Sequence, residues 1–123
     1  MEISKENKNG VVIISLGASL EGAKVVGDIE LDVDNNFMLT EAVEEEFPKG
    51  NVKIVLEMKY VNYVDSSGLG AIFDSYKQVV EKGGIFSIIN PNADVRRVLD
   101  ITKISKKINI FNSEEEALRS YTS

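Results

Sequence analysis

The chain of 123 residues contains no cysteine, no histidine and no tryptophan. Without cysteine it can form neither a disulfide scaffold nor a thiolate zinc site, and it has no thiol nucleophile. Without histidine it lacks the commonest general base and the commonest metal ligand. Hydrolases that depend on a Ser-His-Asp or Cys-His arrangement are therefore excluded.

Long apolar runs are missing as well. The longest stretch without a charged residue, 9–20, has twelve residues, well short of the ~20 that a membrane-spanning helix needs. Residues 1–8 contain four charged side chains and no apolar core, so they do not look like a secretory signal. We therefore expect a cytoplasmic protein with no membrane partner, folded over 1–123 as a single domain.

Acidic side chains outnumber basic ones, with 20 Asp and Glu against 14 Lys and Arg, so the net charge is −6. A nucleic-acid-binding surface needs clustered Lys and Arg. The only basic clusters, at 96–97 and 103–107, are too small for a groove-binding protein. We expect no nucleic-acid partner.

Apolar periodicity along the chain predicts alternating strands and helices. Strands are expected at 2–8, 11–14, 28–34, 52–58, 85–89 and 108–111. Helices are expected at 35–47, from Ser66 to the glycines at 83–84, at 93–100 and after Ser113. Residues 17–27 are expected to be a loop, and 60–64 a short link. This order predicts an α/β domain in which helices pack on a sheet.

Burial can also be predicted for these elements. Strand 52–58 is apolar without alternation, so it needs cover on both faces. The helix over 35–47, capped by Asp34, would bury Phe37, Leu39, Val43 and Phe47. The helix from Ser66 would bury Leu69, Ile72, Phe73, Tyr76 and Val80. The glutamates at 44–46 and 114–116 are expected to face solvent, because consecutive residues diverge around a helix.

One polar motif, Asp65-Ser66-Ser67-Gly68-Leu69-Gly70, lies where a buried strand gives way to a helix. Asp or Ser at a helix start satisfies free backbone N–H groups, so the simplest interpretation is that these residues are caps. Four polar or small residues in a row nevertheless exceed what one cap needs. A hydroxyl at a helix N-terminus is exposed, and the helix dipole would tolerate a phosphate added there.

Two other patterns suggest ligands but fail on spacing. A dinucleotide fingerprint beginning at Gly68 would need glycine at position 73, which is Phe73, and no Gly-Lys-Ser/Thr follows. The alternating acids of 28–34 resemble a calcium loop, but the sixth position is Val33 or Phe37, depending on the start, where such a loop demands glycine. We expect no metal and no cofactor.

The 65–70 motif, preceded by Ile54-Val55-Leu56 and followed by Tyr76-Lys77-Gln78, resembles the anti-sigma factor antagonists of the STAS domain family. Residues 90–102, with a valine, two arginines and a leucine among them, are similar to a later helix of that family. The resemblance covers about residues 5–120. It implies a mixed sheet of four to five strands with about four helices packed on it.

The resemblance also implies a function in binding and no catalysis. The serine directly after the aspartate, Ser66, would be phosphorylated by an anti-sigma factor serine kinase and dephosphorylated by a phosphatase. We expect Asp65, Ser66, Ser67, Gly68 and Leu69 to form the partner-binding surface, although helical phase favours a buried Leu69. Ser67 is the candidate for a structural hydroxyl, and the reverse assignment of the two serines stays open.

The sequence departs from the family pattern in two places. The family usually places a Gly-x-Leu/Ile-Asp segment closely after its second strand, whereas residues 16–17 and 27–29 compete for that role here. Lys103 stands where the family commonly has a helix-ending glycine, at a cost of about 1 kcal/mol. A STAS module of another signalling assembly and a small flavodoxin-like nucleotide-binding protein remain the alternatives.

Overall fold

The computed structural model of the protein describes residues 1–122. Its strands are β1 (Glu2–Lys8), β2 (Val11–Gly17), β3 (Ser19–Glu21), β4 (Lys24–Val26), β5 (Ile29–Leu31), β6 (Lys53–Glu57), β7 (Val61–Val64), β8 (Ile85–Ile89) and β9 (Asn109–Phe111). Its helices are α1 (Asn36–Glu44), α2 (Ser66–Glu81), α3 (Ala93–Ile101) and α4 (Glu114–Thr122), with short 3-10 turns η1 (Phe47–Lys49) and η2 (Ile104–Lys106).

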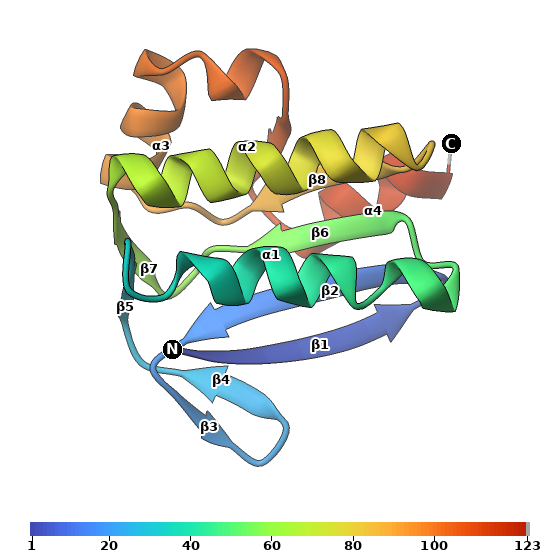
Figure 1. Ribbon diagram of the computed structural model, residues 1–123, viewed down its shortest axis with the longest axis horizontal. Coiled ribbons are helices and arrows are strands. Elements are labelled where there is room, and N and C mark those ends of the chain that lie inside the picture. The colour runs from blue at the N-terminus through green and yellow to red at the C-terminus, as the bar shows by residue number, and fades with distance from the viewer. Residues whose placement is uncertain (123) are drawn as a thin grey trace.

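The main sheet has five strands in the order β1-β2-β6-β8-β9. Strand β1 is antiparallel to β2, and the other neighbours are parallel. Helices α1 and α2 lie side by side across one face, and α4 packs against the other (Figure 1). The predicted α/β architecture, with its mixed sheet and four helices, is confirmed.

Strand β6 lies at the centre of the sheet and is covered on both faces, as its unbroken apolar run predicts. Ile54, Val55 and Leu56 are all fully buried. Ile54 and Leu56 belong to the core beneath α1 and α2, whereas Val55 faces α4. On the α4 side the Tyr121 hydroxyl donates to the Ile54 carbonyl oxygen at 2.6 Å. Burial raises the pKa of Tyr121 to about 12.

Residues 17–34 differ from the prediction. The expected loop at 17–27 contains the β3–β4 hairpin, and the expected strand at 28–34 shrinks to β5. The Asp32 side chain accepts a hydrogen bond from the Asp34 N–H, and the Asn35 side chain accepts one from the Asp32 N–H. Asp and Asn side chains favour such turns over strands. The supposed link at 60–64 contains β7, which pairs with β5 in parallel.

The predicted buried faces of two helices are partly wrong. Phe37 on α1 is 54% exposed and Val80 on α2 is 48% exposed. The buried residues of α1 are Leu39, Ala42 and Val43; those of α2 are Gly68, Ala71, Ile72, Ser75 and Val79. Small side chains allow α2 to pack closely on the sheet. The buried face of α2 is therefore the one that carries its small residues, and not the one that its large residues alone would predict. Asp34 does not cap α1, because Asn35 occupies the position before the helix.

Glu46 was expected to face solvent but is only 3% exposed. Its carboxylate accepts hydrogen bonds from Lys5 Nζ at 2.8 Å, Lys49 Nζ at 3.3 Å and Asn51 Nδ2 at 2.9 Å. Burial acts to raise the pKa of Glu46, but these hydrogen bonds outweigh it and hold the pKa below its usual value. The carboxylate therefore ties the edge strand β1 to the end of α1.

The strain expected after α3 is present. Lys103 adopts the left-handed conformation, with φ of 65° and ψ of 14°. This is the conformation in which glycine commonly ends a helix, and a residue with a Cβ pays for adopting it.

We predict that Glu46→Gln lowers the free energy of unfolding by about 2 kcal/mol at pH 7, because hydrogen bonds to a charged group contribute about that much. The pKa of Glu46 is lower in the folded state, so its contribution is complete above the unfolded pKa of about 4.3. That contribution is lost as the pH falls through the folded value. Urea unfolding at neutral pH and under acid conditions measures both effects.

Glu45→Gln is the matched control, since the Glu45 side chain is 67% exposed and contacts the same Lys5. It should cost less than about 0.5 kcal/mol at either pH. Equal losses for the two variants would show that Glu46 does not act through its buried cluster.

Candidate functional site

The 65–69 segment lies where β7 ends and α2 begins. Because β5 and β7 are parallel neighbours, their carboxyl ends meet at one edge, and residues 31–37 come beside 65–69. Asp65 is the N-cap of α2, with an extended backbone, and Ser66 is the first residue of the helix. The site is therefore built from two segments separated by about thirty positions in the sequence.

The Asp65 carboxylate connects these two segments. Oδ1 accepts hydrogen bonds from the Ser67 hydroxyl at 2.6 Å and the Gly68 N–H at 2.8 Å, and Oδ2 accepts one from the Val33 N–H at 3.2 Å. The bonds from Ser67 and then Gly68 hold the pKa of Asp65 below its usual value. A single anion thus fixes both the first turn of α2 and the turn that precedes α1.

The two serines of the motif have different surroundings. The Ser67 hydroxyl donates to Asp65 and accepts a hydrogen bond from Asn36 Nδ2 at 3.0 Å, and its side chain is half-buried. Ser66 is exposed, and within residues 1–122 no side chain or backbone group forms a hydrogen bond with its hydroxyl. Of the two serines in the motif, Ser66 is therefore the one whose hydroxyl is free within residues 1–122 to meet a partner.

Gly68 serves helix–strand packing. A Cβ at this position would lie 2.6 Å from the Leu31 carbonyl oxygen and 2.9 Å from Val64 Cγ1, so any side chain would push α2 away from β5. Protein atoms occupy the space next to the Gly68 Cα, so no room is left there for a phosphate group. Leu69 is half-buried: part of it packs on the core, and the rest remains accessible beside Ser66.

Sequence reasoning missed three residues that complete this surface. Asn36 binds Ser67, and the Val33 N–H binds Asp65. The Val33 side chain, in the turn before α1, and that of Phe37, in the first turn of α1, are 71% and 54% exposed. Helical phase offered a signal for Phe37, because it lies far around the helix from Leu39 and Val43, which define the buried face. Nothing in the sequence indicated the pairing of Asn36 with Ser67.

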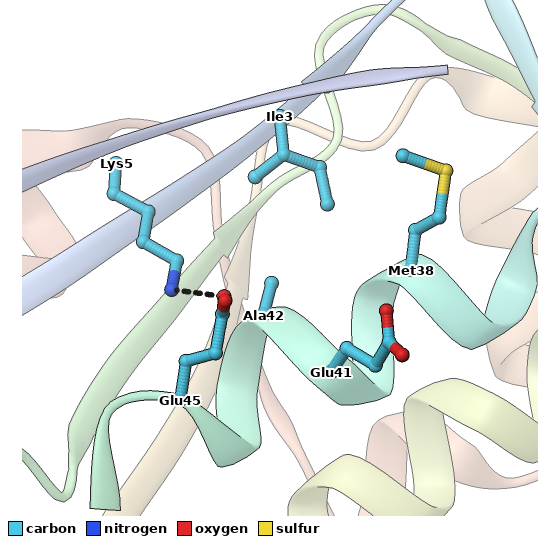
Figure 2. Close-up of a pocket in the computed structure, with 6 residues that line it drawn as sticks. All are labelled: Ile3, Lys5, Met38, Glu41, Ala42 and Glu45. Atoms are coloured by element: carbon cyan, nitrogen blue, oxygen red, sulfur yellow. Dashed lines mark hydrogen bonds and ion pairs between the residues drawn. The ribbon is translucent and has the colours of Figure 1, made fainter.

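An open groove of about 450 Å³ lies between β1 and α1 (Figure 2). It is lined by Ile3, Lys5, Met38, Glu41, Ala42 and Glu45. Two carboxylates line it against one lysine, and that lysine already binds Glu45 at 3.1 Å. This groove is therefore poorly suited to a phosphate-bearing ligand.

Metal binding and membrane crossing find no support over residues 1–122. This part of the chain contains no group of three or more acidic, histidine or cysteine side chains placed to hold a metal ion. None of its helices is both long enough and apolar enough to cross a bilayer.

The model of the STAS domain matches residues 2–117, nearly the whole length of the sequence. The chain belongs to the STAS domain family. This confirms the resemblance seen in the motif at 65–70. The five-stranded sheet with α1 and α2 on one face is thus the STAS fold.

Relatives of this STAS domain are named as anti-sigma factor antagonists. One, from Thermotoga neapolitana, is 36% identical over 103 residues, covering 77% of this chain and 91% of the relative. The anti-sigma F factor antagonist of Paenibacillus polymyxa is 31% identical over 119 residues, covering 96% of this chain and 92% of the relative.

Solved structures show the same fold. A crystal structure from Thermotoga maritima, also described as an anti-sigma factor antagonist, superposes with a TM-score of 0.81 at 25% identity, covering 98% of this chain and 95% of the other. The Bacillus cell fate determinant SpoIIAA, solved in its phosphorylated form, superposes with a TM-score of 0.68 at 19% identity, covering 98% of this chain and 99% of the other.

The Asp65 side chain accepts hydrogen bonds from the Gly68 N–H and from the Val33 N–H. We predict that Asp65→Asn keeps the first of these bonds and loses the second. The asparagine oxygen can still accept from the Gly68 N–H, but its NH₂ group cannot accept from the Val33 N–H. Amide hydrogen exchange followed by NMR should therefore speed up at Val33 and change little at Gly68. Asp65→Ala should accelerate exchange at both amides. Unchanged exchange at Val33 in both variants would contradict the bridging role.

Proposed function

We propose that this STAS domain is an anti-sigma factor antagonist controlled by phosphorylation of Ser66. Unmodified, it binds an anti-sigma factor serine kinase and so frees a sigma factor. Phosphorylated, it releases that kinase, and a phosphatase acting on phospho-Ser66 restores binding. The observation that carries the proposal is the exposed hydroxyl of Ser66 at the start of α2. It forms no hydrogen bond within residues 1–122, whereas the neighbouring Ser67 hydroxyl is bonded twice.

The names of the relatives support the antagonist role, and the solved phosphorylated form of SpoIIAA supports control by phosphate. A binding function also agrees with the chemistry of the chain, which has no histidine or cysteine for acid–base or nucleophilic catalysis. The domain itself is then the substrate of the kinase and catalyses nothing.

Phosphorylation acts on the interface more strongly than on the fold. A phosphoserine adds about −1.5 to −2 charges, which moves the chain from −6 to roughly −8 at one exposed point. Within the domain the group lies at a helix N-terminus, where an anion is favoured by about 0.3–1 kcal/mol. At the interface with a partner the same group is bulky and strongly hydrated. Docking must therefore either remove water from the phosphate or leave the phosphate outside the interface.

The proposed docking surface extends from Asp65–Leu69 to the turn before α1. Val33 in that turn and Phe37 in the first turn of α1 offer exposed apolar area, and the hydrogen bonds of Asp65 and Asn36 hold the turn against the start of α2. The neighbouring acids at 30, 32 and 34 give this surface a negative rim. We therefore expect the kinase to meet it with an apolar pocket bordered by Lys or Arg.

We predict that phosphorylation of Ser66 weakens kinase binding several hundredfold, which corresponds to a loss of ~3–4 kcal/mol. Ser66→Asp should reproduce part of that loss, and Ser66→Ala should bind constitutively and accept no phosphate. Titration calorimetry of each form with the kinase recovered from the protein's own lysate measures the affinity. Circular dichroism should show the same fold throughout.

Ser67→Ala is the control, because it removes the neighbouring hydroxyl and leaves Ser66 in place. After incubation with the kinase and ATP, phosphopeptide mapping should find label on Ser66 in this variant. Label on Ser67 alone in the wild type, or continued phosphorylation of Ser66→Ala, would overturn the assignment.

We also predict that Phe37→Ser weakens kinase binding about tenfold or more, because exposed aromatic side chains at the centre of an interface carry much of its binding energy. Val80→Ser is matched in exposure, on the same face of the sheet, and should change the affinity less than about twofold. Equal effects of the two substitutions would place the interface away from the turn before α1.

A further inference from the structure

A second charged surface lies at the end of α3 and on η2. Residues 96–107 contain five Lys or Arg and one Asp, so this stretch carries +4 within a chain of net charge −6. We define the lysine patch as Lys103, Lys106 and Lys107 together with Ile101. None of these residues belongs to the surface proposed around Ser66.

The positive charge of the lysine patch is uncompensated. The two arginines before it form ion pairs: Arg96 with Asp100 at 3.3 Å, and Arg97 with Asp94 at 3.6 Å. Across residues 1–122, by contrast, no carboxylate pairs with Lys103, Lys106 or Lys107, and all three side chains are exposed.

An exposed apolar residue accompanies these lysines. Ile101 is 71% exposed, whereas Ile104, the first residue of η2, and Ile108, two residues after η2 ends, are 8% and 0% exposed. The two buried isoleucines anchor the segment on the core, so the patch is held on a fixed scaffold. It combines cations and an apolar group, both turned to solvent.

The backbone at Lys103 supplies an independent observation. Its left-handed conformation, with φ of 65°, is one that glycine adopts without the Cβ penalty. The chain therefore keeps a cation at a position where the backbone favours glycine. Residues held in a disfavoured conformation often mark functional surfaces.

We propose that the lysine patch is a second docking surface, which binds an acidic protein segment that carries an apolar side chain. Opposite charge would draw the segment to the three lysines, and its apolar group would cover Ile101. An anionic bilayer or a nucleic acid fits less well, because the rest of the chain carries −10 and would be repelled by an extended anionic surface. This surface works independently of Ser66.

The test is an NMR titration of the ¹⁵N-labelled full chain with a synthetic peptide in which glutamate and leucine alternate. At millimolar peptide, amide shifts at 101–107 should move saturably, while those at 28–37 and 65–69 should not. A peptide with serine in place of leucine should bind several-fold more weakly, because it cannot cover Ile101. Ser66→Asp should leave the titration unchanged.

Two triple variants of equal net charge distinguish an effect of the lysine patch from an effect of net charge alone. The triple substitution Lys103→Gly, Lys106→Ser, Lys107→Ser should weaken peptide binding about tenfold or more. The triple substitution Lys24→Ser, Lys53→Ser, Lys77→Ser removes three other exposed lysines and should change binding less than about twofold. Lys103→Gly alone should raise the melting temperature by a few degrees and still weaken binding, which separates binding from stability.

Three results would overturn the proposal. One is the absence of saturable shifts at 101–107 with the glutamate–leucine peptide. Another is equal weakening by the two triple variants, which would reduce the effect to net charge. The third is co-sedimentation with phosphatidylglycerol vesicles that the patch variant abolishes, without peptide binding, since this would make the patch a membrane surface.

Discussion

The Asp65 carboxylate is the constraint on which the rest of the site depends. It caps the first turn of α2 through Gly68 and Ser67, and it also holds the Val33 amide. Helix termini leave free N–H groups, and a carboxylate with two oxygens can serve donors from two segments at once. The same anion therefore determines where Ser66 is displayed and which residues stand beside it.

This arrangement suits a switch that acts by binding. The hydrogen bonds of the Ser67 hydroxyl hold the site together, whereas the neighbouring Ser66 hydroxyl has no hydrogen-bond partner in the described part of the chain, 1–122. The N-terminus of α2 tolerates a negative charge on Ser66, whereas the same charge would weaken binding of a partner to the docking surface. Fold stability and partner affinity can then respond differently to one modification. The lysine patch, on other elements, would give the domain a second contact of opposite charge.

Prediction from sequence was accurate wherever an element carries a strong local signal. Strands β6 and β8 and the end of α2 near its glycines follow from apolar runs and turn residues. Accuracy fell where small residues decide packing. The spacing of large side chains predicts a buried Val80, whereas Ala71 and Ser75 set the orientation of α2. The prediction that Glu46 faces solvent is wrong because Lys5, which binds it, lies on β1 about forty residues away, and sequence spacing does not reveal such a contact.

The sequence by itself determined the alternation of strands and helices, the motif at the start of α2, the family that this motif resembles and the strained helix end at Lys103. These depend on spacing, local propensity and turn chemistry, which act over a few residues. Only the tertiary structure decided that β5 pairs with β7, that Asn36 binds Ser67 and that the Val33 N–H binds Asp65. Those facts rest on contacts between segments far apart in the chain, and their geometry exists only when the sheet and its helices have come together.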